Sequence, residues 1–139
     1  MKAIKLATGV TPTCWRPPYG DVDDRIRYIA NALGLITIIW QHDSFDWELG
    51  EPVGPGGSII TPQDVDNTYQ TFINNATEGL YNATGTIILT HELNNFTMSE
   101  AVKFYPQLKA AFDVCLLVYL WVVVLTIDLL SILYRLVLR

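Results

Sequence analysis

The sequence predicts an α/β protein in which short strands alternate with helices, followed by a C-terminal hydrophobic helix. Residues 35–40 and 86–90 are short, apolar and rich in β-branched residues, which is typical of buried strands. Each run precedes a segment in which apolar residues recur at helical spacing. Because the order strand, helix, strand, helix, strand, helix favours parallel pairing, we expect an α/β sheet or barrel.

The first strand ends in a rigid turn close to the N-terminus. Residues 1–8 have the pattern of a helix end, and an extended segment then leads to Arg16. Pro17 and Pro18 fix their own φ angles and extend the residue before them, so residues 19–20 should turn away from the strand. Taken alone, this segment is explained equally well by a strand, a proline turn and a helix that carry no chemistry.

A helix is predicted directly after this turn, over residues 22–33. Asp21 precedes it as the expected N-cap, and Gly34 supplies the C-terminal stop. The apolar residues that recur at helical spacing, and so form the expected inner face, are Val22, Ile26, Ile29 and Leu33.

Two more strand–helix units follow the same plan. Strand 35–40 is followed by a loop rich in Gly and Pro, and Thr61-Pro62 then opens a helix with Pro in its first turn. Strand 86–90 precedes a third helix over residues 99–112. The expected inner face of the second helix consists of Val65, Tyr69, Phe72 and Ile73.

Composition and charge exclude some classes of function and favour others. A net charge of −5, with nine Lys and Arg and no basic stripe, argues against nucleic-acid binding. The two cysteines, Cys14 and Cys115, are too few for a disulfide framework. Glycosylation sequons beginning at Asn75, Asn82 and Asn95 favour a secreted or cell-surface protein, although the N-terminal residues lack the apolar region of a signal peptide.

Four polar residues lie at the predicted carboxyl ends of the strands: Arg16, Asp43, Asp46 and His91. In parallel α/β folds, catalytic residues collect at these ends. A single His or an Asp-x-x-Asp-Trp loop is more often structural. The combination favours function, because a carboxylate can tune a histidine as a general acid and an arginine can keep a second carboxylate ionised.

The histidines do not form a recognisable zinc site. His91-Glu92 begins like a zincin motif, but Asn95 stands where the second histidine would be needed. His42 and His91 are the two histidines of the chain. We therefore expect no metal ligands among these residues.

Three segments, in this order, resemble the third, fourth and fifth motifs of the polysaccharide deacetylases (carbohydrate esterase family four), and in particular those of fungal chitin deacetylases. The resemblance covers about residues 1–113. It implies a partial, distorted (β/α) barrel and hydrolysis of the N-acetyl groups of N-acetylglucosamine units in chitin or its oligomers. The segments are Arg16-Pro17-Pro18-Tyr19-Gly20-Asp21, Asp43-Ser44-Phe45-Asp46-Trp47 and Ile88-Leu89-Thr90-His91.

The resemblance also implies roles for individual residues. Arg16 would orient the catalytic base, and the backbone N–H of Tyr19 would help to hold the tetrahedral oxyanion. His91 would be the general acid that protonates the departing amine, with Asp43 beside it setting its pKa. Leu89 would form the wall near the acetyl methyl group and Trp47 an apolar face for the sugar. The residues expected to contact substrate are Trp47, Leu89, Asp46 and Pro18.

The family's base and metal ligands have no counterpart in this sequence. Its first motif, of Thr-Phe-Asp-Asp type, and its second, His-x-x-x-His, are both missing. The family implies a divalent cation, zinc or cobalt, that activates the attacking water. We therefore expect a C-terminal portion of the catalytic domain that is inactive alone. The alternatives are a non-catalytic, membrane-attached carbohydrate-binding remnant and a small membrane protein whose soluble part is incidental.

The last part of the chain is strongly apolar. Residues 114–134 contain Asp128 as their single charge, and a helix of this length spans about 30 Å, the thickness of a bilayer core. The short basic tail 135–139 would place the C-terminus in the cytoplasm and the sequons outside. Because the family resemblance stops near residue 113, a reading-frame change or an unspliced intron is the alternative explanation that we favour slightly.

Overall fold

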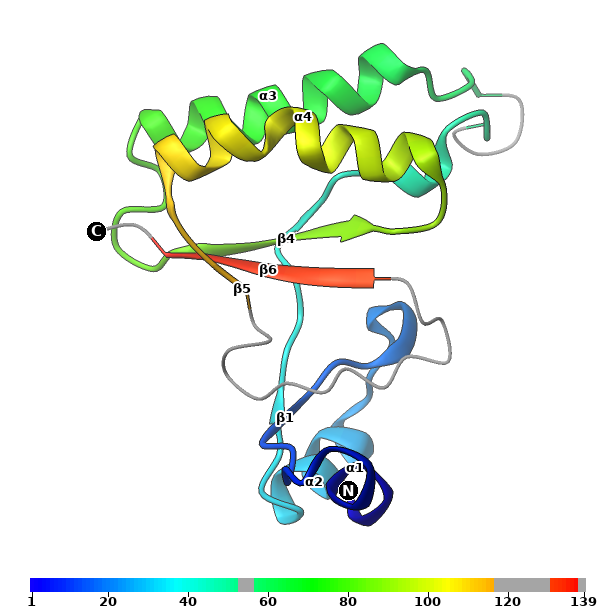
Figure 1. The fold of residues 1–139 in the computed structure, drawn as a ribbon, viewed down its shortest axis with the longest axis vertical. Coiled ribbons are helices and arrows are strands. Elements are labelled where there is room, and N and C mark those ends of the chain that lie inside the picture. Colours follow the sequence, from blue (N-terminus) through cyan, green and yellow to red (C-terminus); the bar gives the residue numbers. More distant parts are fainter. Residues whose placement is uncertain (53–56, 117–130, 138–139) are drawn as a thin grey trace.

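The computed structural model describes residues 1–52, 57–116 and 131–137. A four-stranded sheet is covered on one face by two long helices, α3 (Pro62–Thr77) and α4 (Asn95–Ala111). A smaller unit, at the lower end of Figure 1, consists of α1 (Lys2–Thr8), β1 (Cys14–Trp15), α2 (Asp24–Ala32) and β2 (Ile36–Thr37). The predicted α/β class is thereby confirmed.

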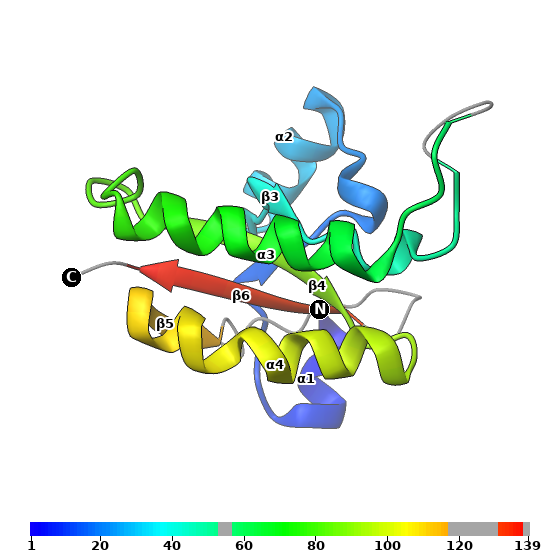
Figure 2. The ribbon, with the colours of Figure 1, turned by 90° about the horizontal axis from the view of Figure 1, so that it is seen from above.

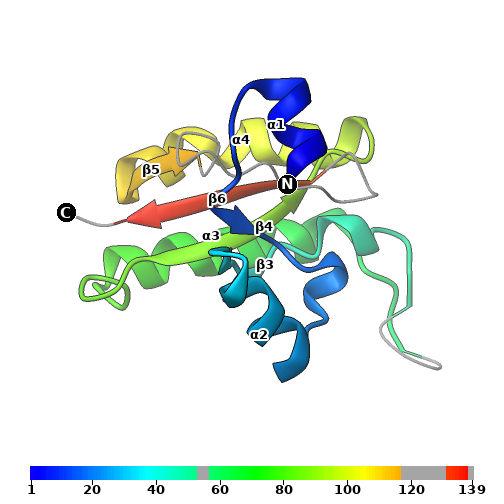
Figure 3. The same ribbon diagram turned by 90° about the horizontal axis from the view of Figure 1, so that it is seen from below.

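The strands form two separate sheets. The larger one has the order β3-β4-β6-β5, with bounds His42–Asp43, Thr86–His91, Ser131–Val137 and Asp113–Leu116 respectively. Strands β3 and β4 are parallel, and so are β1 and β2, as the alternating order predicts. Strand β6 runs antiparallel to both β4 and β5. Viewed from below, β4 and β6 lie in front of α3 and α4 (Figure 3).

The predicted buried strand 35–40 is only partly confirmed. Its first half pairs with β1, because the Ile38 N–H donates to the Trp15 carbonyl at 2.9 Å. Just beyond it, the Gln41 N–H donates to the Ile87 carbonyl at 3.1 Å, so the chain changes partner and joins the larger sheet. Regular pairing in this run is restricted to β2, where Ile36 is 62% exposed rather than buried. A run of apolar residues does not reveal such a change of partner.

Helices α3 and α4 pack side by side and enclose the main core (Figure 2). Thr61 caps α3 with a capping box, and the predicted inner face is confirmed, since all four of its residues are buried. The Tyr69 ring stacks on Phe104 with centroids 4.7 Å apart. Helix α4 begins at Asn95, earlier than predicted, because the Asn94 side chain accepts from the N–H groups of Phe96 and Thr97.

The prediction for α2 was wrong at its N-cap and only partly right on its inner face, where Val22 and Ile26 are half-buried. The cap is Asp23 rather than Asp21, since Asp23 Oδ1 accepts from the Ile26 N–H at 2.8 Å. Gly34 does end the helix, with a φ of 73° that favours glycine. Ile29 and Leu33 are 47% and 54% exposed. Helical spacing identified the apolar stripe of α2, but the described residues leave the C-terminal half of this stripe about half exposed.

The hydrophobic helix predicted over residues 114–134 is not found where the structure describes this run. Both ends are strands, β5 at Asp113–Leu116 and β6 at Ser131–Val137, while residues 117–130 lie outside the described residues. No helix in the described part of the chain is long and apolar enough to cross a membrane. A continuous apolar run rich in Val and Ile fits a strand as well as a helix, which explains the error.

Candidate active site at the strand ends

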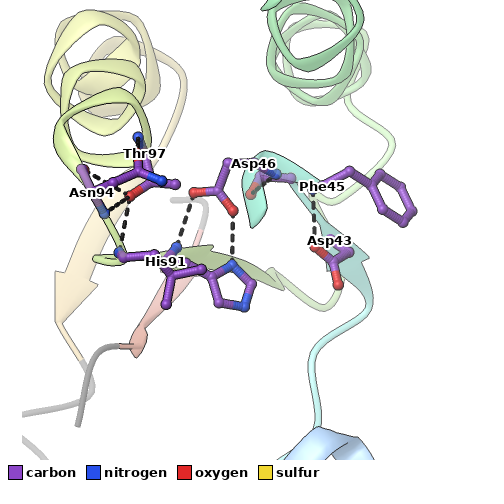
Figure 4. A network of polar contacts seen from close by, with 8 residues as sticks. Asp43, Phe45, Asp46, His91, Asn94 and Thr97 are labelled. Carbon is purple, nitrogen blue, oxygen red and sulfur yellow. Dashed lines mark hydrogen bonds and ion pairs between the residues drawn. The ribbon is translucent and has the colours of Figure 1, made fainter. Parts of the chain in front are cut away.

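His91, the last residue of β4, is held by a buried carboxylate from the neighbouring segment. Asp46 opens the 3-10 helix η2 (Asp46–Glu48), which follows β3. Its Oδ1 lies 2.7 Å from His91 Nδ1, and its Oδ2 accepts from the His91 backbone N–H at 2.9 Å (Figure 4). Because a carboxylate accepts hydrogen bonds, Nδ1 carries the imidazole proton and Nε2 is left for a ligand.

The structure shows which of the two aspartates binds His91 directly. Asp46 was expected to contact substrate, but its side chain is fully buried and its oxygens bind His91. Asp43 was expected beside His91. It lies within electrostatic reach of His91, whose charge lowers the pKa of Asp43, but its Oδ1 accepts from the Phe45 N–H at 2.9 Å. The motif contained both carboxylates, but spacing alone could not show which one would turn inward.

Burial raises the pKa of Asp43 above the usual value for an aspartate. The Phe45 N–H and the charge of His91 lower this pKa, Asp46 raises it further, and a hydrogen bond with the Trp47 side chain lowers it. Asp43 is therefore partly buried, and it interacts with the Asp46 carboxylate and the Trp47 side chain of the same motif.

Arg16 lies buried at the end of β1, at the entrance to the proline turn. Its guanidinium carbon is 5.3 Å from the centre of the Trp40 ring, a cation–π distance. Burial lowers the pKa of Arg16, while the charge of Asp43 acts in the opposite direction. Arg16 and Asp43 are thus near enough to interact electrostatically, although they come from different strands.

The proline turn packs directly on the same tryptophan. A Cβ added at Gly20 would lie 3.0 Å from Trp40 Cη2, and the φ of Gly20 is 72°. The ring of Trp40 therefore contacts both Arg16 and the turn that follows it. The sequence analysis did not single out Trp40, because it was one more apolar residue in a predicted strand.

Two turns of the predicted motifs contain strained backbone. Among the described residues, Tyr19 and Phe45 are the non-glycine residues with positive φ, at 56° and 55°. Such conformations cost roughly 1–3 kcal/mol each and cluster at functional sites. The N–H groups of Gly20 and Asp21 donate to the carbonyl groups of Pro17 and Pro18, at 3.1 and 3.0 Å.

The remaining predicted site residues surround this cluster. The Trp47 ring is 47% exposed, and its centre lies 6.3 Å from that of His91. Leu89 is buried and packs with Cys14, on the face of β4 turned towards β1. Pro18 is exposed in the turn.

The turn after His91 is fixed by a residue that the sequence analysis missed. Thr97 is fully buried, and its Oγ1 accepts from the N–H groups of Leu93 and Asn94 at 3.0 and 3.2 Å. The Asn94 side chain caps α4 in return (Figure 4). The signal was present as Asn-x-x-Thr at a helix start, a capping-box pattern.

The described residues do not fit a divalent cation. In the ranges 1–52, 57–116 and 131–137 there is no group of three or more His, Cys, Asp or Glu residues that could hold one. His91 offers Nε2 as a single ligand, and His42 lies on the other side of its strand, against Phe72 and Tyr81. The cluster consists of a histidine, two carboxylates and an arginine.

Comparison with known proteins identifies the family. The family model described as Polysaccharide deacetylase matches residues 1–38. Chitin deacetylase 2 of Cryptococcus neoformans var. grubii is 50% identical over 112 residues, which are 81% of this chain and 23% of that protein. The chitin deacetylase of Amylomyces rouxii is 47% identical over 111 residues, 80% of this chain and 24% of that protein.

A more distant relative agrees with these two. Chitin deacetylase 2 of Saccharomyces cerevisiae is 38% identical over 102 residues, 73% of this chain and 28% of that protein. The chain spans about a quarter of the length of these curated relatives. Together with the three motifs in their order, these similarities show that the chain belongs to the polysaccharide deacetylase family.

Proposed function

We propose that this chain is part of a metal-dependent chitin deacetylase, a hydrolase that removes N-acetyl groups from N-acetylglucosamine units. The observation that carries the proposal is the His91–Asp46 pair at the end of β4, with Arg16 and Asp43 beside it. The relatives are named as chitin deacetylases, which supports chitin and its oligomers as the substrate class.

In this proposal His91 is the general acid. Its Nε2–H transfers a proton to the amide nitrogen as the C–N bond breaks, so that the sugar leaves with an amine and the acetyl group becomes acetate. Asp46 keeps the second imidazole proton on Nδ1 and stabilises the imidazolium before the transfer. Asp46 is a positioning residue here, because it is buried and acts through His91.

The proline turn would serve the developing oxyanion. The Tyr19 N–H, held in a left-handed conformation, would donate to that oxygen. Arg16 would supply positive charge beside the reacting group and hold a carboxylate in its ionised form. Trp47, Leu89 and Pro18 would contact the sugar and its acetyl group.

Activation of the attacking water is the half of the reaction that we do not assign to these residues. The family implies a divalent cation, zinc or cobalt, for this step, but the described residues do not fit one, so no step is derived through it. We therefore expect this chain alone to bind N-acetylglucosamine oligomers without releasing acetate. By family, we also expect a secreted or cell-wall protein.

Binding and acetate release test this proposal together. The purified chain is titrated with the tetramer of N-acetylglucosamine and with the tetramer of glucosamine, and acetate is measured with and without added zinc or cobalt. A site built around the acetamide should favour the acetylated tetramer by at least about tenfold, since a site made for one polar group rejects an analogue that lacks it. Equal affinity, or binding of neither tetramer, would contradict the proposal.

A non-catalytic carbohydrate-binding remnant is the second candidate, favoured by the half-exposed Trp47 ring. In that case Trp47→Ala would abolish binding of the tetramer, while His91→Gln would leave both affinity and selectivity unchanged. The deacetylase proposal predicts instead that His91→Gln and Arg16→Met reduce the preference for the acetylated tetramer.

A further inference from the structure

A hollow lies between β3 and α3, on the side of Asp43 away from His91. It has a volume of about 410 Å³ and is lined by both polar and apolar side chains. Figure 4 shows the Phe45 ring turned away from His91 and towards the side of α3. Phe45 also lines this hollow. The hollow is therefore distinct from the His91–Asp46 pair, although Asp43 borders both.

One stripe of α3 gives the hollow its chemistry. Asn67, Thr68, Thr71 and Asn75 line it, and this spacing places them along one side of the helix. Their side chains are amides and hydroxyls, which donate and accept hydrogen bonds without carrying charge. Asn67 and Thr71 are exposed, so their polar groups are accessible from the solvent.

The other side of the hollow is formed by aromatic rings and by the imidazole of His42. His42 packs edge-on against Phe72 and Tyr81, with ring centres 4.9 and 5.2 Å away. Phe45 is 43% exposed and has a left-handed backbone conformation, with a φ of 55°. Burial lowers the pKa of His42, so its imidazole is neutral at pH 7 and presents one donor and one acceptor.

These groups match an uncharged polyhydroxylated ring. A sugar presents hydroxyls that both donate and accept, which amide and hydroxyl side chains can bind, and an apolar face that an aromatic ring can cover. The volume falls within the range of small-ligand pockets. Phosphorylated or strongly acidic ligands fit poorly, since the charged side chain on the lining is Asp43.

We propose that the hollow between β3 and α3 binds one uncharged pyranose unit, with Phe45 against its apolar face and Asn67 and Thr71 bonded to its hydroxyls. The identity of that unit as N-acetylglucosamine rests on the proposed function. Asp43 then separates two sugar sites, so that a sugar chain bound at the candidate active site has a second contact on α3.

The two histidines allow each site to be observed separately. His42 reports on the hollow and His91 on the candidate active site, and the chain contains no others. The full chain, labelled with ¹³C and ¹⁵N at histidine, is titrated with the disaccharide of N-acetylglucosamine and with cellobiose. The imidazole signals are assigned from a His91→Gln variant.

Thr71→Trp should fill the hollow, and Gln70→Trp is its matched control on the neighbouring exposed position of the same helix. We expect the disaccharide to shift the His42 signals in the unaltered chain and in Gln70→Trp, and at least tenfold weaker binding at His42 in Thr71→Trp. The His91 response should persist in both variants.

A milder variant covers the case in which Thr71→Trp does not fold. Asn67→Ala with Thr71→Val removes two hydrogen-bonding groups and should weaken the His42 response roughly tenfold. Gln70→Ala is its control, because Gln63–Asn67 and Gln70–Asn74 are equivalent side-chain pairs on α3. Shifts at His91 without shifts at His42, or a His42 response that survives both altered hollows, would overturn the proposal. The first result would leave the proposed function intact, whereas silence at both histidines would contradict both.

Discussion

Replacing Asp46 should both destabilise the chain and release the His91 ring. The carboxylate accepts two hydrogen bonds, at 2.7 Å from the ring and 2.9 Å from the backbone, and its side chain has no exposed surface. Asp46→Asn keeps one acceptor oxygen and loses the other, so one hydrogen bond to a charged group disappears, at a cost of about 1.5–3 kcal/mol. Asp46→Ala leaves both donors of His91 without the carboxylate, at a cost of about 3–5 kcal/mol.

Urea denaturation and histidine NMR measure the two effects. In thermal unfolding, the loss of free energy in Asp46→Asn corresponds to a fall in Tm of about 5–10 °C for a chain of this size. The ¹⁵N signals of His91 should show the proton fixed on Nδ1 in the unaltered chain and a mixture of tautomers in Asp46→Asn. Asp21→Asn is the control, since Asp21 is exposed. A loss below about 0.5 kcal/mol in Asp46→Ala, which is the scatter of surface substitutions, together with unchanged His91 signals would refute the pairing.

Three further predictions concern the elements around the site. Asp23→Ala should cost about 1 kcal/mol in the free energy of unfolding while Asp21→Ala costs little, because Asp23 is the cap of α2; equal losses would contradict this assignment. Gly20→Ala should cost about 1–3 kcal/mol and more than Gly9→Ala, since both have positive φ but only Gly20 meets Trp40; an equal cost in thermal unfolding would contradict the packing. Burial lowers the pKa of His42, so the unfolded chain binds its proton more readily and stability falls as the pH drops below 6.5. His42→Phe should therefore lose less stability than the unaltered chain between pH 7.5 and 5.5, as measured by urea denaturation, and identical slopes would argue against it.

The parts of the fold that the sequence predicted are those governed by local rules. Proline at the first turn of α3, with a Thr cap, and glycine after α2 each fix a helix end through backbone geometry. The strand at Thr86–His91 was predicted from a short β-branched run and the inner face of α3 from helical spacing. Both predictions hold because these segments pack against each other.

The remaining elements depend on partners that are distant in the sequence. Residues 35–43 change from one sheet to the other, and the direction in which Ile29 and Leu33 point has no local signal. The apolar run after residue 113 contains strands at both of its ends, where periodicity cannot separate strand from helix.

In the candidate site, too, the sequence predicted the features set by local rules and missed those set by distant partners. The predicted strands placed Arg16, Asp43, Asp46 and His91 at their carboxyl ends, and the structure confirms that position. Which aspartate binds His91 is decided by the left-handed backbone at Phe45, which turns Asp46 inward beside β4. Trp40 was missed for a related reason, since its contact with Arg16 joins residues from two different strands.

Titration of the full chain with the tetramer of N-acetylglucosamine, observed at the imidazole of His91, tests the central claim most directly. If the strand-end cluster receives the acetamide group, the His91 signals shift and saturate with the acetylated tetramer, and they respond at least about tenfold more weakly to the glucosamine tetramer. His91 signals that remain unchanged at saturating concentrations of the acetylated tetramer would contradict the assignment of this cluster to a deacetylase site.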